Sequence, residues 1–222
     1  MHRTRILIAD DHPVFRQGLV SVFRNESGIT VIGEAADGQQ ALKLTEELRP
    51  DVLLLDLMMP RMTGLETLRE LCNSPTPVRT IMLTASIAKE QIAQALQLGA
   101  RGIVLKDAST DILLKSIHAV MAGKFWVGEH SVTDLVEILH AYLPPAGGLE
   151  KNSRKNFGLT PRELDVVESI VSGFTNREIA KKYSISEQTV KHHLRSIFDK
   201  VGVSNRLELA LFAINHRLVS NE

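Results

Sequence analysis

Residues 51–66 have the sequence DVLLLDLMMPRMTGLE, and this stretch decides the fold of the first half of the chain. It begins with the unbroken apolar run Val52–Leu55, which is followed by the carboxylate of Asp56. A short apolar run without alternation is typical of a parallel strand that helices cover on both faces. Pro60 interrupts the chain, and apolar side chains then recur at helical spacing from Thr63 onward. The stretch therefore predicts a buried strand, a turn and a helix, with Asp56 at the carboxyl end of the strand.

The same alternation of strand and helix extends over roughly the first 125 residues. Short apolar runs predict strands at Arg5–Asp10, Thr30–Ala35, Val52–Asp56, Arg79–Thr84 and Gly102–Leu105. Longer periodic segments predict helices at His12–Arg24, Gly38–Leu48, Thr63–Leu71, Lys89–Leu98 and Thr110–Met121. Strand–helix units joined by right-handed crossovers form an open, doubly wound sheet. We therefore expect an α/β domain with a five-stranded parallel sheet.

A break in composition follows this domain. Residues 144–156 contain two prolines, two glycines and a run of polar side chains, which continue neither a helix nor a buried strand. Just before them, Val132–Leu143 has the apolar spacing of an amphipathic helix. The expected organisation is a first domain at 1–127, a linker with this helix at 128–156 and a second domain at 157–222.

The second domain has helical patterns throughout. Thr160–Glu163 and Thr175–Glu178 have the sequence of capping boxes, which mark the starts of two helices. Two further helices are predicted at about Ser186–Val201 and Ser204–Arg217. This pattern predicts a small all-α domain of four helices.

The overall composition excludes several classes of protein. The chain has 222 residues, of which 44% are hydrophobic and 23% charged, as in a globular protein rather than a disordered one. No apolar run approaches the ~18 residues of a membrane span, and the first residues lack the apolar core of a signal peptide. Cys72 is the single cysteine, which excludes an intrachain disulfide and a cysteine-cluster zinc site. We expect a soluble, cytoplasmic protein with no membrane partner.

Polar side chains stand at the ends of the predicted strands, at Asp10, Asp11, Asp56, Thr84 and Lys106. The carboxyl ends of parallel strands meet at one edge of a sheet, where such folds bind their ligands. Three carboxylates that close repel one another unless a cation or a proton is bound, and hard oxygen ligands suit Mg²⁺. A lysine and a hydroxyl beside the metal would complete a cradle for a phosphoryl group. The histidines show no ligand spacing with a second His or Cys, so we assign no metal to His12, His118, His130 or His140.

At these residues the sequence resembles the receiver domain of response regulators, which has a flavodoxin-like fold. The matching segments are IADDHPVFRQGL at 8–19, DVLLLDLMMPRMTGLE at 51–66, IMLTA at 81–85 and GIVLKDAS at 102–109. Together they span nearly all of residues 4–122. The resemblance implies a signalling protein rather than an enzyme, which accepts a phosphoryl group from a partner histidine kinase.

The resemblance also implies a role for each polar residue. Asp56 would be the phosphoacceptor, Lys106 would pair with one phosphoryl oxygen, and Thr84 would hydrogen-bond another. The Mg²⁺ ligands would be Asp11, Asp56 and the main-chain carbonyl of Met58, with Asp10 assisting through water. Ile103 departs from the pattern, because receivers usually carry an aromatic residue there that reports phosphorylation to the surface. A β-branched side chain is stiff at χ1, so the route by which the signal leaves the site is in doubt.

The second domain is the basic half of the chain. Residues 151–222 contain 12 basic and 8 acidic side chains, against 14 and 18 in residues 1–150. The segment from Thr175 to Val201 has the pattern helix, short turn, helix. Its last helix carries an apolar stripe at Val190, Leu194, Ile197, Phe198 and Val201. The opposite face presents Lys191, His192 and Arg195, as in a helix that enters the major groove of DNA.

Residues 159–210 resemble the LuxR-type helix-turn-helix, with the sequence LTPRELDVVESIVSGFTNREIAKKYSISEQTVKHHLRSIFDKVGVSNRLELA. A receiver followed by this module is identified as a member of the NarL/FixJ family of response regulators. By resemblance, Lys191, His192 and Arg195 would contact bases or phosphates of double-stranded DNA. Lys200 and Asn176 would contact the DNA backbone, whereas Glu163 would serve as a helix cap and an internal ion-pair partner.

The combined hypothesis is a transcription regulator that phosphorylation converts to a DNA-binding homodimer. Two alternatives stay open. The first is a DNA-binding regulator whose receiver is not switched by phosphate, to which Ile103 lends weight. The second is a metal-dependent phosphotransfer enzyme, which ranks far lower because Met58 occupies the place of the second aspartate in the usual phosphatase signature.

Overall fold

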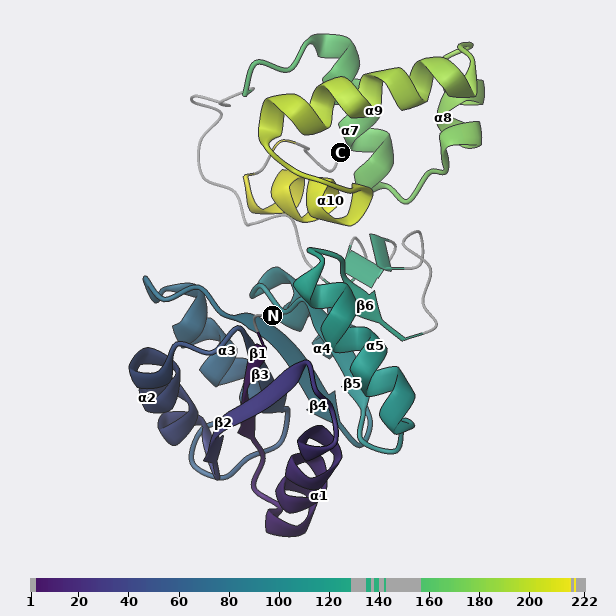
Figure 1. The fold of residues 1–222 in the computed structure, drawn as a ribbon. Coiled ribbons are helices and arrows are strands. Elements are labelled where there is room, and N and C mark those ends of the chain that lie inside the picture. Colours follow the sequence, from purple (N-terminus) through teal and green to yellow (C-terminus); the bar gives the residue numbers. More distant parts are fainter. Residues whose placement is uncertain are drawn as a thin grey trace. The chain divides into compact units, whose positions relative to one another are not determined.

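The computed structural model describes residues 3–128, 135–136, 138–139, 142, 157–216 and 218. The chain forms two compact units, Met1–Gly128 and Glu129–Glu222 (Figure 1). Of the predicted helix Val132–Leu143, residues 135, 136, 138, 139 and 142 are helical and the others lie outside the described residues. The linker 144–156 also lies outside them.

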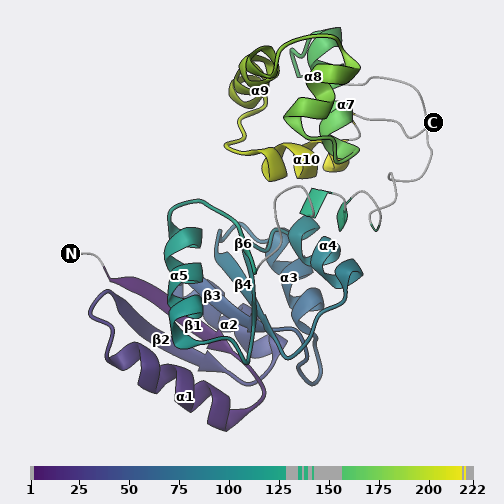
Figure 2. The same ribbon diagram turned by 90° about the vertical axis from the view of Figure 1, so that its right-hand side faces the viewer.

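The first unit is a parallel sheet with helices on both faces. Its strands lie in the order β2-β1-β3-β4-β5-β6. The strands are β1 Thr4–Ala9, β2 Ile29–Ala35, β3 Val52–Asp56, β4 Arg79–Thr84, β5 Gly102–Leu105 and β6 Trp126–Val127. The helices are α1 Pro13–Arg24, α2 Gly38–Leu48, α3 Gly64–Cys72, α4 Lys89–Gln97 and α5 Thr110–Met121. Figure 2 shows α1 and α5 on one face and α2, α3 and α4 on the other, which confirms the doubly wound fold.

The expected number of strands was too low by one. The sheet has six strands because β6 pairs in parallel with β5, with Gly102 opposite Trp126 and Ile103 opposite Val127. A strand of two residues is too short to show a pattern in the sequence. It adds an edge to the sheet and leaves the order of the other strands unchanged.

Alternate residues of the central strands form the two halves of the core. One half packs against α1 and α5 and contains Ile6, Ile8, Val52, Leu54, Ile81, Leu83, Leu19, Phe23 and Ile117. On the other face of the strands, Leu7, Leu53, Leu55 and Met82 are fully buried. The strands are buried on both sides, which explains why their sequences are continuously apolar. At an apolar transfer free energy of about 25 cal/mol per Å², this burial is the main stabilising contribution to the unit.

The second unit contains four helices within residues 157–216: α7 Pro161–Val171, α8 Asn176–Lys182, α9 Glu187–Val201 and α10 Arg206–Asn215. Both predicted capping boxes are present, since the Thr160 and Thr175 side chains accept from the backbone amides of Glu163 and Glu178. The last helix starts at Arg206, which is later than the predicted start at Ser204. The Asn205 side chain accepts from the Glu208 amide and is therefore the N-cap. The predicted end at Arg217 lies outside the described residues.

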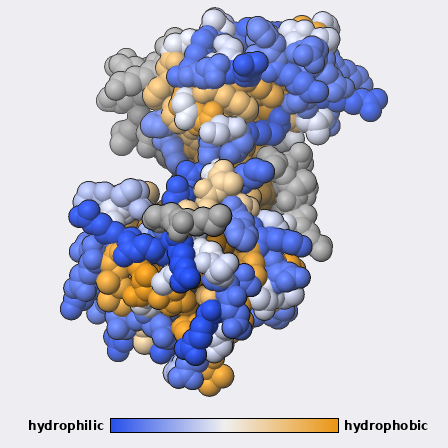
Figure 3. Space-filling model, viewed as in Figure 1, coloured by the Kyte–Doolittle hydropathy of each residue, from blue (hydrophilic) through white to orange (hydrophobic). Residues whose placement is uncertain are grey.

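None of the helices within the described ranges is long and apolar enough to cross a lipid bilayer. Polar side chains cover most of the face that Figure 3 shows, with apolar side chains in smaller patches between them.

Glu163 joins α7 to α9 through a buried carboxylate. Its oxygens accept from Lys200 Nζ at 2.6 and 2.9 Å and from Ser196 Oγ at 2.7 Å. Burial by itself raises the pKa of the Glu163 carboxyl, but hydrogen bonds from Lys200, Thr160 and Ser196 outweigh it and lower the pKa to about 2. Glu163 is thus a helix cap and an ion-pair partner, as expected from the sequence.

Glu163→Gln should lower the free energy of unfolding of this unit by about 2 kcal/mol at neutral pH, because it leaves the Lys200 ammonium without its anion. Glutamine can keep the capping hydrogen bond to the Thr160 amide, so the loss of stability measures the contribution of the Glu163 charge. In the wild-type chain the ionised carboxylate stabilises the fold above its ordinary pKa of 4.5, and that stability is lost as the pH falls toward 2. The variant should lack this pH dependence.

Urea unfolding of the full chain from pH 2 to 7, with hydrogen exchange of the α7 and α9 amides, measures the effect. Glu168→Gln, on the exposed face of the same helix, is the matched control and should behave as wild type. Equal pH dependence of wild type and Glu163→Gln would contradict the assignment.

Candidate functional site

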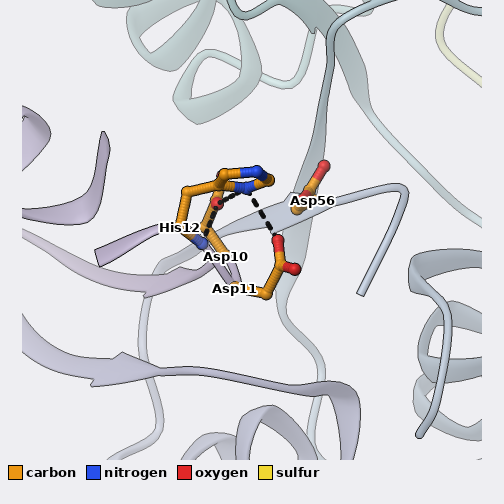
Figure 4. Close-up of side chains that lie close together, drawn as sticks. All are labelled: Asp10, Asp11, His12 and Asp56. Carbon is orange, nitrogen blue, oxygen red and sulfur yellow. Dashed lines mark hydrogen bonds and ion pairs between the residues drawn. The ribbon is translucent and has the colours of Figure 1, made fainter. Parts of the chain in front are cut away.

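The adjacent strands β1 and β3 bring the acidic side chains together. These strands pair in parallel with Ala9 opposite Leu55, so the next residues, Asp10 and Asp56, leave the sheet side by side. Ligand atoms of Asp10, Asp11, His12 and Asp56 all lie within 4.8 Å of one another (Figure 4). We call these four residues the acidic cluster. Asp10 and Asp56 are buried, with 0% and 2% of their surfaces exposed.

Lys106 supplies the positive charge beside the acidic cluster. Its Nζ lies 2.7 Å from Asp10 Oδ2 and 2.9 Å from Asp56 Oδ2. The Lys106 amide donates to Thr84 O at 2.8 Å, which fixes the chain just after β5. The structure therefore brings Lys106 to the carboxylates that the sequence analysis assigned to the same edge of the sheet.

The charges in this buried site shift one another's protonation. Burial raises the pKa of the Asp56 carboxyl above its ordinary value, and the hydrogen bond with Lys106 only partly offsets this. The negative charge of Asp10 raises the same pKa further. Burial by itself lowers the pKa of the Lys106 ammonium, but the carboxylates of Asp10 and Asp56 raise it by more. An additional cation would therefore relieve the repulsion between the carboxylates.

Thr84 and Met58 flank Asp56 on neighbouring segments. Thr84 ends β4 and is buried, and its hydroxyl donates to Ser86 O at 2.5 Å. The Met58 amide donates to Asp56 Oδ1 at 3.3 Å, so the loop after β3 turns back over the carboxylate. The Met58 side chain is exposed, which leaves the main chain as the part of this residue nearest the cluster.

His12 is a member of the acidic cluster that the sequence reasoning missed. Its Nδ1 lies 2.7 Å from Asp11 Oδ1 and 3.2 Å from Asp10 Oδ1 (Figure 4). The search for a second His or Cys at ligand spacing overlooked a histidine whose partners are the two aspartates before it. The His12 amide also donates to Asp10 Oδ1 at 2.8 Å, and Pro13 was the available signal because it marks the start of α1 directly after His12.

The acidic cluster fits a divalent cation such as Mg²⁺. Three oxygens of the acidic cluster are buried, Asp10 Oδ2, Asp11 Oδ1 and Asp56 Oδ2. Their close contacts are Lys106 Nζ, beside the Asp10 and Asp56 oxygens, and the His12 ring, 2.7 Å from Asp11 Oδ1. Buried carboxylate oxygens with free lone pairs are the ligands that Mg²⁺ prefers.

The second unit presents basic side chains on the exposed face of α9. Val190, Leu194 and Ile197 are buried, whereas Lys191, His192 and Arg195 are exposed on the opposite face. Of the two predicted backbone contacts, Asn176 begins α8 and its Oδ1 accepts from Arg206 Nη1 at 3.3 Å. Lys200 has its ammonium in the ion pair with Glu163. The exposed basic surface of α9 is therefore formed by Lys191, His192 and Arg195, whereas Lys200 is paired with Glu163.

Residues 6–118 match the family model of the response regulator receiver domain, and residues 158–213 match that of the luxR family of bacterial regulatory proteins. The chain belongs to the NarL/FixJ family of response regulators. This response regulator is 37% identical over 213 residues to the nitrate/nitrite response regulator protein NarL of Escherichia coli (strain K12), with 96% of each chain covered. It is 33% identical over 216 residues to the transcriptional regulatory protein LiaR of Bacillus subtilis (strain 168), covering 97% of this chain and 99% of that protein.

Solved structures of response regulators are similar to nearly the whole of this chain. The response regulator ChrA of a heme-sensing two-component system matches with a TM-score of 0.50 and 31% identity, covering 99% of this chain and 100% of that one. The response regulator RcsB in an RcsB–DNA complex matches with a TM-score of 0.55 and 26% identity, covering 95% and 98%. The chain is a DNA-binding transcriptional regulator of the two-component type.

Proposed function

We propose that Asp56 is the phosphoacceptor of this response regulator and that a sensor histidine kinase is the donor. The observation that carries the proposal is the buried Asp56 carboxylate with Lys106 Nζ 2.9 Å away, in a cluster with Asp10 and Asp11. Mg²⁺ held by Asp11, Asp56 and the Met58 carbonyl, with Asp10 assisting through water, would neutralise charge on the transferring phosphoryl oxygens. The receiver would then extend over residues 1–127, with a linker to 156 and the DNA-binding domain from 157.

Phosphoryl transfer depends on positioning and charge more than on acid–base chemistry. An Asp56 oxygen attacks phosphorus as the bond to the donor imidazole nitrogen breaks, and the electron pair returns to that nitrogen. Lys106, now divided between Asp10 and Asp56, turns its ammonium to a phosphoryl oxygen as the negative charge there increases. The exposed Ala85 leaves room for the donor beside Thr84.

The Thr84 hydroxyl provides the first step of the switch. It now donates to Ser86 O, and a phosphoryl oxygen on Asp56 would be a stronger, charged acceptor for the same proton. Exchange of these two hydrogen bonds moves the start of the β4–α4 loop. A phosphoryl group adds nearly two negative charges, enough to shift an equilibrium between two states of the receiver.

A receiver that does not respond to phosphate is the second candidate, and Ile103 is the observation that favours it. Ile103 is 5% exposed and lies opposite Met82 in the β4–β5 pair. A buried isoleucine has little freedom to swing between an inward and an outward position. The acidic cluster and Lys106 nevertheless favour phosphorylation, so we rank this candidate second.

The DNA contact is proposed to come from the exposed face of α9. Lys191, His192 and Arg195 would reach bases or phosphates in the major groove, with Asn176 on the backbone. We give Lys200 a structural role first, because Glu163 already holds its ammonium. A homodimer would place two α9 helices about 10 base pairs apart. A regulator that binds promoters acts where the DNA is, which in a bacterium is the cytoplasm.

Asp56→Asn should abolish phosphoryl uptake from acetyl phosphate or a histidine kinase, because the amide is a far weaker nucleophile of the same shape. Mass spectrometry of the intact protein after incubation with acetyl phosphate and Mg²⁺ measures it. Asp111→Asn, on the exposed start of α5, is the control and should be labelled as wild type. Stable labelling of Asp56→Asn would show that the nucleophile is misassigned.

Beryllofluoride, which mimics the phosphoryl group, should raise the affinity of the full chain for its operator if phosphorylation controls DNA binding. Equilibrium binding with and without the mimic tests this, with Asp56→Asn as the unresponsive control. An unchanged affinity would favour the phosphate-independent regulator.

Lys191→Ala should weaken DNA binding several-fold and reduce the slope of log affinity against log salt by about 1, because one phosphate contact is lost. Fluorescence anisotropy with a labelled operator at several salt concentrations measures both quantities. Lys115→Ala, exposed on α5, should leave them unchanged. Wild-type affinity and slope in Lys191→Ala would remove this lysine from the DNA contact.

A further inference from the structure

The loop between β3 and α3 is fixed at its base. The Leu57 amide donates to Leu83 O at 2.9 Å, and the Gly64 amide donates to Leu57 O at 2.9 Å. A Cβ added to Gly64 would lie 2.9 Å from Leu57 Cα, so α3 starts directly against the backbone of β3. Met58, whose carbonyl is a proposed metal ligand, stands at the start of this loop. Its position therefore depends on how the rest of the loop is held.

The outer part of the loop contains a residue in an unfavourable conformation. Arg61 has φ +65°, in the left-handed region that a residue with a Cβ adopts at a cost. Its guanidinium forms an ion pair with the carboxylate of Asp37, 24 residues earlier in the chain. This contact crosses from the loop to the start of α2 and links the two segments.

Asp37 is a rigid anchor for this contact. It is the N-cap of α2, and its side chain accepts from the Gln40 amide at 2.8 Å. The hydrogen bond from Gln40 and the neighbouring Arg61 lower the pKa of its carboxyl, which keeps it ionised. A Cβ added to Gly38 would lie 2.8 Å from Met62 Cγ, so the start of α2 also packs against the residue after Arg61.

We propose that Asp37 and Arg61 are positioning residues for the phosphoacceptor loop. Their ion pair holds the outer part of the loop against the start of α2 and so keeps the Met58 main chain over Asp56. Neither residue belongs to the acidic cluster, so the pair acts through the loop backbone. The proposal rests on the proposed function, because the property it controls is the affinity of the cluster for Mg²⁺ and the rate of phosphoryl uptake.

A double-mutant cycle on the full chain tests the proposal, with Mg²⁺ affinity measured by calorimetric titration. Arg61→Ala keeps a Cβ in the left-handed conformation and removes the guanidinium. Asp37→Asn keeps the cap and removes the charge. Each change should weaken Mg²⁺ binding about three- to fivefold, and the double variant should be no weaker than either single one. Arg61→Lys should recover part of the affinity, which a purely structural loss would not show.

Two comparisons separate positioning from general destabilisation. Lys43→Ala removes an exposed ion pair with Glu47 on the same helix, α2, and should leave Mg²⁺ binding unchanged. Arg61→Gly suits the left-handed backbone, so a weaker Mg²⁺ affinity there, with the urea midpoint unchanged, would assign the effect to the ion pair. Wild-type Mg²⁺ affinity in Arg61→Ala and Asp37→Asn, or effects that add fully, would overturn the proposal while the role of Asp56 stands. Absence of Mg²⁺ binding by the wild-type chain would overturn the proposed metal site itself.

Discussion

The receiver unit depends on one electrostatic arrangement, a lysine ammonium held between two buried carboxylates. Lys106 contacts both Asp10 and Asp56, which come from different strands. Without a cation between them, two buried negative charges at this distance would repel each other strongly and take up protons instead. Lys106 therefore offsets part of the cost of burying the two carboxylates. The charge that neutralises the carboxylates is also the charge that a phosphoryl group requires.

Much of this was predictable from the sequence because parallel strands leave few choices. Continuous apolar runs placed the five long strands, and the rule that carboxyl ends share one edge placed Asp10, Asp11, Asp56 and Lys106 together. The short β6 could not be predicted, since two residues contain no period. The start of α10 was predicted too early, at Ser204, because Ser204 and Asn205 are both residues that cap helices well and the sequence alone does not choose between them.

Contacts between distant side chains were the part that the sequence could not supply. Nothing in the spacing of Asp37 and Arg61 indicates that they meet, because the contact depends on how α2 packs beside the loop after β3. The same holds for Lys200, whose place on the basic helix suggested an outward role. Its length allows the ammonium to reach back to the buried Glu163 carboxylate, and that internal partner is visible only in three dimensions.

The pairing of Lys200 with Glu163 has a consequence for how α9 encounters a polyanion. Because the Lys200 ammonium is paired with Glu163, the carboxyl-terminal turn of the helix adds less outward positive charge. Lys191 and Arg195, which are exposed earlier in the helix, then supply most of its outward positive charge. Long-range attraction would then orient this end toward the duplex before any groove is entered, and the approach itself would select the polarity of docking.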